Sequence, residues 1–243
     1  MEKETTKPRF EEVVAVTTMN LPDFGLKFNA QRVGPMNLAG LRQADYGEEF
    51  RMPTMPELVS LVYASLENKD YKTAKEVINT LRSHWLTGNT GIHYVPEGMF
   101  VQDNPDLNQR RISMSQKDLE SRLGSHQEKG VIFSDDKSVR FVPYVFKRGS
   151  QSSLDLARNP GVIALTGSEE KAEMLAKASQ HYRLNPYFYA LSNVDSPQTR
   201  VADLYSYYFG GGLDVVAGGS GDYEVRFSFG VLGDTKGVAP KNK

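Results

Sequence analysis

The chain has 243 residues, 39% hydrophobic and 24% charged, enough to bury a sizeable core as one large domain or two small ones. Its formal net charge of −1 argues against a domain-wide basic field, so nucleic acid is not an expected partner. The absence of cysteine excludes disulfides, thiolate nucleophiles and cysteine-ligated metal sites.

The apolar runs are too short to span a bilayer, so we expect no membrane insertion. The first 12 residues have mixed charge and lack the apolar stretch of a signal peptide. We expect them to form a tail, and residues 236–243 to form a second tail.

The first third of the chain predicts short strands followed by helices. Apolar alternation predicts strands at 13–17 and 26–28, and a helix is expected between Pro35 and Gly47. Thr54 and Glu57 have the spacing of a capping box, in which each side chain satisfies a free backbone N–H of the other, and an apolar helical repeat follows. A further helix is expected at 71–85.

From residue 87 the pattern changes to short, mixed elements. The sequence predicts strands at 92–95 and 99–102, a helix at 117–123 capped by Ser115, and a hairpin of strands 131–133 and 139–142. It then predicts a helix at 153–158, a strand at 162–165, a helix capped by Ser168, and strands at 187–191 and 225–232. No repeat or low-complexity linker separates these pieces. The chain is therefore expected to be α+β, with a single domain at 13–235 and a possible insertion at about 87–185.

Three motifs were candidates for chemistry. The run GGGLDVVAGGSG is followed by a strand pattern, whereas a phosphate-binding loop needs a helix after its glycines. The segment QDNPD, at 102–106, fits a turn better than a calcium site, although calcium remains an alternative. The histidines show no metal-binding spacing, and no nucleophile motif is present, so we expect no catalytic site, metal or cofactor.

Residues 203–230 have a distinctive composition. Tyr, Gly, Ser, Asp, Val and Phe dominate, and Lys, Asn, Thr, Gln and Ile are absent. The stretch ends in an alternation typical of a half-buried strand, with Val225, Phe227, Phe229 and Val231 on one side and Glu224, Arg226 and Ser228 on the other. Tyrosine gives a large amphipathic contact area with few rotatable bonds, and Ser and Gly adapt to different partners, as in antibody loops. This composition favours a contact surface, although tyrosines half-buried against a sheet would also account for it.

The segment FRMPTMPELVSLVYA resembles the helix-opening motif of the formylglycine-generating-enzyme subclass of C-type lectin folds. The matching residues are Phe50, Arg51, Met52, Pro53, Thr54 and Glu57. Those enzymes use cysteines, which this chain lacks, so their activity is not implied. Combined with the C-terminal composition, the motif resembles the variable proteins of diversity-generating retroelements. In that family, randomised adenine-rich codons become Tyr, Ser, Gly, Asp and similar residues.

This resemblance implies a C-type lectin fold with a central insertion and a non-catalytic, receptor-recognising function for a protein or other macromolecular ligand. The implied variable patch consists of Tyr205, Ser206, Tyr207, Tyr208, Phe209, Gly210, Gly211, Gly212, Asp214, Ser220, Asp222 and Tyr223. The alternatives are an enzyme of the same fold with an unidentified site, and a structural module of a virion or cell surface. Display on a virion or cell surface fits the resemblance, and the sequence leaves the oligomeric state open.

Overall fold

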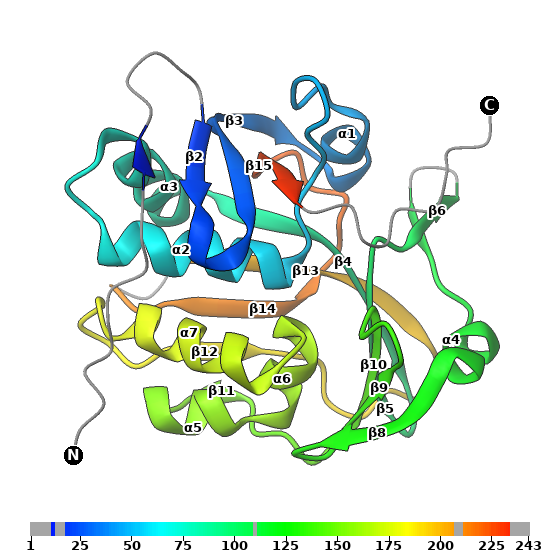
Figure 1. The fold of residues 1–243 in the computed structure, drawn as a ribbon. Helices are drawn as coiled ribbons and strands as arrows, with labels where there is room; N and C mark the ends of the chain where they lie inside the picture. Colours follow the sequence, from blue (N-terminus) through cyan, green and yellow to red (C-terminus); the bar gives the residue numbers. More distant parts are fainter. Residues whose placement is uncertain (1–10, 13–17, 109–110, 207–210, 234–243) are drawn as a thin grey trace.

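The computed structural model of the chain describes residues 11–12, 18–108, 111–206 and 211–233 (Figure 1). The two predicted tails and the predicted strand at 13–17 lie outside these residues, apart from Glu11–Glu12, which form strand β1. Within the described ranges no helix is long and apolar enough to cross a membrane.

The fold is built on a mixed 13-stranded sheet. Its main path follows the order β1-β2-β3-β15-β4-β13-β14-β12-β11, and β5, β10, β9 and β8 form a branch that leaves from β4. The strands of the main path are β1 (Glu11–Glu12), β2 (Thr18–Leu21), β3 (Leu26–Met36), β15 (Arg226–Gly233), β4 (Trp85–Val95), β13 (Gln198–Tyr205), β14 (Asp214–Gly219), β12 (Tyr187–Tyr189) and β11 (Gly149–Ser150). Those of the branch are β5 (Gly98–Asp103), β10 (Val139–Pro143), β9 (Val131–Ser134) and β8 (Leu123–Glu128), and a separate hairpin comprises β6 (Asp106–Asn108) and β7 (Arg111–Ser113).

Strand β4 is the centre of this arrangement because it pairs with three strands. Its first residues run parallel to β15, most of its length is antiparallel to β13, and its second half is antiparallel to β5. Strands β13 and β15, which carry the ends of the C-terminal stretch, therefore lie on either side of the same strand.

Helices cover one face of the sheet. Figure 1 shows α2, α6 and α7 layered in front of the strands, and α2 packs against α3, α6 and α7. The helices are η1 (Pro22–Phe24), α1 (Leu38–Gln43), α2 (Met55–Glu67), α3 (Lys72–Ser83), α4 (Gln116–Arg122), α5 (Ser153–Arg158), α6 (Pro160–Thr166) and α7 (Glu169–Ser179). The predicted α+β class is confirmed.

The predicted capping box is present at the start of α2. The Glu57 carboxylate accepts hydrogen bonds from the Thr54 backbone N–H at 2.7 Å and from both terminal nitrogens of Arg51, at 2.9 and 2.6 Å. Arg51 in turn exchanges backbone hydrogen bonds with Val231 on β15. The motif therefore caps α2 and also attaches its first turn to the sheet.

The predicted strand at 162–165 is wrong: these residues belong to helix α6. Pro160 occupies the first turn, Asn159 caps it by accepting from the Gly161 N–H, and Gly167 ends the helix at φ +84°. The helix is buried on all sides from 161 to 166. A helix without a solvent-facing side has no amphipathic period, so its sequence resembles a buried strand.

Two further expectations need correction. The helix expected to reach Trp85 ends at Ser83, because Trp85 already begins β4. Strand β15 is not half-buried: Arg226 and Ser228, expected to face solvent, are both 0% exposed. A buried polar side chain needs a hydrogen-bond partner. Arg226 donates to Asp203, and Ser228 donates to the Thr87 carbonyl.

The segment at about 87–185, a possible insertion according to the sequence, forms parts of the main sheet path, the helices and the branch. It supplies most of central strand β4 and helices α5 to α7, which are partly or wholly buried. Its other part forms the branch of β5, β10, β9 and β8 and the separate β6–β7 hairpin.

Candidate functional site

The residues predicted to form the variable patch are separated by the structure into three groups. Tyr205, Ser206 and Asp214 are buried, at 7%, 6% and 5% exposure. The second group is exposed or half-buried and comprises Gly211, Gly212, Ser220, Asp222 and Tyr223. The third group lies outside the described residues and comprises Tyr207, Tyr208, Phe209 and Gly210.

A buried ion pair supports the C-terminal stretch. Arg226 on β15 donates two hydrogen bonds of 3.2 Å to the carboxylate of Asp203 on β13, and both side chains are 0% exposed. The Thr87 hydroxyl donates a third hydrogen bond to Asp203, at 2.5 Å. The guanidinium of Arg226 also lies 4.7 Å from the ring centre of Trp85. This pair links the two strands that flank β4, since both charges are satisfied only when β13 and β15 are in place.

Gly219 is required by this ion pair. A Cβ atom at this position would lie 2.4 Å from Asp203 Oδ2 and 2.9 Å from the second terminal nitrogen of Arg226. A glycine in a strand often marks such a close approach. Part of the glycine content of the C-terminal stretch is therefore structural rather than adapted to contact.

Among the described residues of the stretch, the exposed ones lie in the turn between β14 and β15. Tyr223 and Val225 are 60% and 48% exposed. The turn is nevertheless held at both ends, because the Gly221 carbonyl accepts a hydrogen bond from the Leu38 N–H at 3.1 Å and the Tyr223 carbonyl accepts one from Arg226 at 3.0 Å. The Tyr223 ring lies edge-on to Trp85, with 6.2 Å between ring centres. An aromatic side chain is thus presented to solvent on a fixed backbone.

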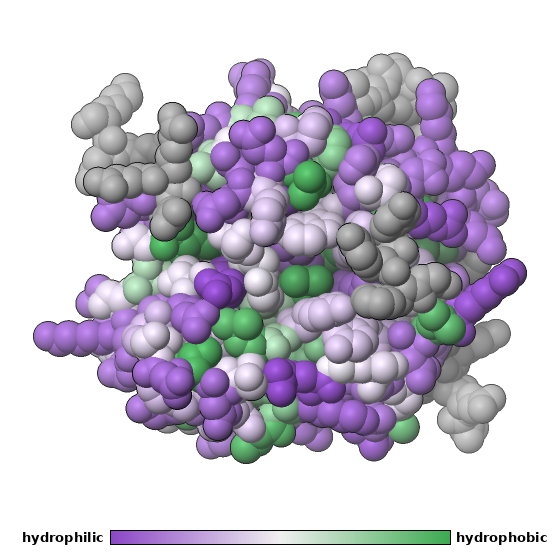
Figure 2. All heavy atoms as spheres, turned by 180° about the vertical axis from the view of Figure 1, so that it is seen from behind, coloured by the Kyte–Doolittle hydropathy of each residue, from purple (hydrophilic) through white to green (hydrophobic). Residues whose placement is uncertain are grey.

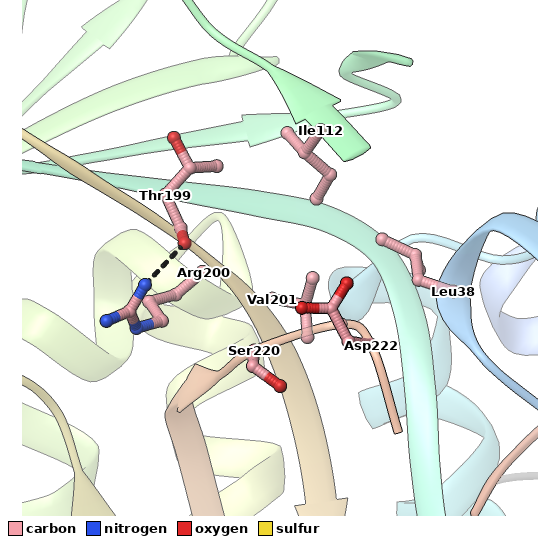
Figure 3. A pocket seen from close by; sticks show the side chains of 8 residues that line it. Leu38, Ile112, Thr199, Arg200, Val201, Ser220 and Asp222 are labelled. Carbon is pink, nitrogen blue, oxygen red and sulfur yellow. Dashed lines mark hydrogen bonds between the residues drawn. The ribbon is translucent and has the colours of Figure 1, made fainter. Parts of the chain in front are cut away.

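A pocket of about 270 Å³ opens beside this turn (Figure 3). In Figure 3 the side chains of Leu38, Ile112 and Val201 converge on it, and Asp222 lies next to Val201. The remaining lining residues are Thr199, Arg200, Ser220 and Gly221. The Arg200 guanidinium is turned to one side, where it donates to the Thr199 carbonyl at 2.9 Å and to Gln198 Oε1 at 2.6 Å. The pocket thus combines aliphatic walls with hydroxyl and charged groups at its rim.

The pocket joins four segments that are distant in the sequence. Leu38 belongs to α1, Val201 to β13 and Ile112 to β7, while the predicted patch residues Ser220 and Asp222 come from the turn. Sequence analysis did not predict Ile112 as part of a site. An apolar side chain in a polar segment indicates a contact, but only the tertiary structure shows that Ile112 lines this pocket.

Gly91 allows the β6–β7 hairpin to reach the pocket. A Cβ atom on Gly91 would lie 2.8 Å from Met114 Sδ and 3.1 Å from Ile112 Cγ2. Because the glycine leaves this space open, the hairpin lies directly on β4. The middle segment thereby contributes one wall of the pocket.

Buried Asp214 has a perturbed acidity. Burial raises the pKa of its carboxyl from 3.8 to about 6. It lies opposite Tyr205 on the neighbouring strand, and Tyr205 contacts Trp85 with 6.3 Å between ring centres. These side chains lie beneath the surface, so a ligand on this face would meet the turn rather than them.

The other candidate motifs serve structural roles. Both carboxylate oxygens of Asp103, in the QDNPD segment, accept internal hydrogen bonds, one from Thr90 and one from Arg140, each at 2.6 Å. The glycine run leads into β14, not into a helix. His93 shares a 3.1 Å hydrogen bond with Thr199, and burial lowers its pKa. Among the residues that can be described, no three His, Asp or Glu side chains cluster as a metal site.

The face opposite that of Figure 1 is mainly hydrophilic (Figure 2). Its described residues form small, separate hydrophobic areas and a pale central zone of intermediate hydropathy. A ligand on this face would therefore meet a mixed surface, not one broad apolar patch.

Comparison with known proteins supports the architecture. No family model matches the chain, and no curated protein matches its sequence. A solved structure from Nanoarchaeota is similar to it, with a TM-score of 0.50 and 18% identity over 91% of this chain and 100% of that chain. That protein is described as accommodating massive sequence variation by the C-type lectin fold. A likeness at this identity establishes architecture and not function or subclass, and this chain has the C-type lectin fold.

Proposed function

We propose that the chain is a non-catalytic binding protein that docks a protein or other macromolecular ligand on the turn at 220–225 and the pocket beside it. The observation that carries the proposal is an exposed aromatic turn built on a fully buried ion pair. A fixed backbone reduces the entropy lost on binding, and an aromatic anchor beside a pocket is typical of interface hot spots.

We further propose that the C-terminal stretch is the hypervariable segment of a diversity-generating-retroelement variable protein. The C-type lectin fold supports this proposal, as does the sequence variation attributed to the Nanoarchaeota protein of similar structure. Within this proposal, variation is expected at exposed positions and not at buried ones. Exposed Asp222, Tyr223 and Val225 can change without disturbing the core, whereas Asp203 and Arg226 cannot.

Two randomised libraries of the full chain test this division. The first varies the codons of Ser220, Asp222, Tyr223 and Val225, and the second varies those of Asp203, Gly219, Arg226 and Ser228. Each library is displayed on yeast, exposed to protease and sequenced to count the variants that remain folded. Most members of the first library should survive and few of the second. Equal losses in both would refute the proposal that the turn is a tolerant display site.

Natural sequences provide the second test. The gene and its downstream DNA are sequenced from many isolates. Substitutions should fall on exposed positions of 203–230, where a nearby near-copy of the sequence has adenine, and should spare Asp203, Gly219 and Arg226. A uniform gene without a second copy would refute the retroelement proposal and leave the binding proposal to the library experiment.

A further inference from the structure

A second pocket, of about 370 Å³, lies away from the turn. It is enclosed by the C-terminal end of α2, one side of α3 and the residues that follow α7. Its lining residues are Leu66, Lys69, Asp70, Lys75, Ile78, Asn79, Arg82, His181 and Tyr182. Basic side chains dominate the ionisable part of this lining, and Leu66 and Ile78 give it a buried apolar floor.

Helix α3 supplies the central part of the pocket. Lys75, Ile78, Asn79 and Arg82 follow one another at the spacing that places side chains on the same helix face. Lys75 and Arg82 are both exposed, and they form no ion pair with any residue that the structure describes. This face of α3, here called the α3 strip, therefore has Lys75 at one end and Arg82 at the other, with Ile78 and Asn79 between them.

The negative groups near the pocket do not balance these cations. Glu67 is bound to His181, with 2.8 Å between Oε1 and Nε2. Glu76 on α3 is paired with Arg32, at 3.3 Å. Asp70 is the acidic residue that lines the pocket, against Lys69, Lys75 and Arg82. With His181 taken as neutral, the lining residues therefore carry three positive charges and one negative charge.

Helix stability does not explain all of this charge. Lys69 and His181 follow the C-terminal ends of α2 and α7, where a cation is favourable. Lys75, by contrast, lies in the first turn of α3, where a cation is unfavourable. The helix dipole therefore does not explain why Lys75 lies at this position.

Tyr182 also lines this pocket. It is half-buried, and burial raises the pKa of its phenol, against the opposing effects of the Ser206 hydroxyl and the Arg82 guanidinium. The hydroxyl oxygen itself is buried, so the phenol is not counted among the groups that contact an anion in the pocket.

We infer that this pocket binds a phosphate-type or sulfate-type oxyanion that carries an apolar or aromatic body. Lys75 and Arg82 attract the anionic head from the two ends of the α3 strip, Lys69 adds a third cation to the lining, and Leu66 and Ile78 contact the body. Guanidinium and ammonium groups are the side chains that recognise such oxyanions. The site shares no lining residue with the pocket beside the turn, so the inference does not depend on the proposed function.

Phenyl phosphate is a suitable probe, because it has both a head and a body of the required kind. Its binding to the full chain is measured by calorimetry at low and at physiological salt, with inorganic phosphate in parallel. Lys75→Ala and Arg82→Ala should each weaken binding by about threefold to fivefold at low salt, the upper part of the range for exposed charge pairs. Lys72→Ala removes the same charge from the first turn of α3 without touching the pocket and should leave the affinity unchanged.

Phenyl phosphate should bind more tightly than inorganic phosphate, and higher salt should weaken both. Arg82→Lys, which keeps the charge, should restore most of the affinity lost in Arg82→Ala. Thermal unfolding of each variant shows whether it is folded. Absence of saturable binding, equal affinity for the two probes, or an equal loss in the folded Lys72→Ala variant would overturn the inference.

Discussion

Replacing Arg226 by methionine tests the central structural claim, that the ion pair beneath the C-terminal stretch holds β13 and β15 together. The substitution keeps most of the side-chain volume but removes the charge. Asp203 would then remain 0% exposed with one hydrogen bond, from Thr87, in place of three. Removing one partner of a buried pair costs about 3 to 5 kcal/mol, because it leaves an uncompensated charge in the interior.

The assay is urea unfolding at pH 7, followed by circular dichroism and by tryptophan fluorescence. Trp85 is the sole tryptophan of the chain, and its ring centre lies 4.7 Å from the Arg226 guanidinium, so its fluorescence reports on the perturbed site. Coincidence of the two curves would show that unfolding is cooperative. Arg226→Met should lower the free energy of unfolding by about 3 to 5 kcal/mol.

Two further variants make the reasoning refutable. Adding Asp203→Asn to Arg226→Met removes the buried negative charge and should recover part of the loss. Arg32→Met removes a half-exposed arginine that pairs with Glu76 and should cost no more than about 1 kcal/mol. The reasoning fails if Arg226→Met costs less than about 1 kcal/mol or if the double variant is as unstable as Arg226→Met alone.

Three other predictions follow from single contacts. Glu57→Gln weakens the cap of α2 and its ion pair with Arg51, and should lower the free energy of unfolding by about 1 to 2 kcal/mol in urea titrations; an unchanged value would contradict the role given to the motif. Because burial raises the pKa of Asp214 to about 6, its ionised form opposes folding above that pH, and this effect disappears as the pH falls from 6 to 4. Asp214→Asn should therefore raise the thermal unfolding temperature at pH 8 but not at pH 4. An equal rise at both pH values would contradict the raised pKa of Asp214. Gly91→Val places a side chain where Met114 lies, so limited proteolysis should cut the β6–β7 hairpin faster than in the parent protein, and an unchanged cleavage rate would show that the hairpin does not rest on β4.

Several helices could be predicted because their signals are local. The capping box of α2, the Ser115 cap of α4 and the Ser168 cap of α7 involve atoms within one helical turn, and each forms as expected. The hairpin of β9 and β10 was likewise predicted from neighbouring residues. Strands β13 and β14 were not predicted, because their mixture of apolar, glycine and charged residues is explained by partners elsewhere in the chain.

The candidate site could be predicted only in part. Composition indicated the C-terminal stretch as a contact surface, and the exposure of Tyr223 is consistent with that interpretation. Composition does not show that Tyr205 and Asp214 are buried. It also does not identify Ile112 as a wall of the pocket. Ile112 and Val201 line the same pocket although almost 90 positions separate them in the sequence.

The sequence by itself determined where most helices begin, because caps and turns depend on hydrogen bonds between near neighbours. It also determined the chemical character of residues 203–230. Only the tertiary structure decided that 160–166 is a helix, that both faces of β15 are buried, and that Gly219 accommodates an ion pair. These features depend on which distant strands and helices surround each residue, and a one-dimensional pattern contains no such information.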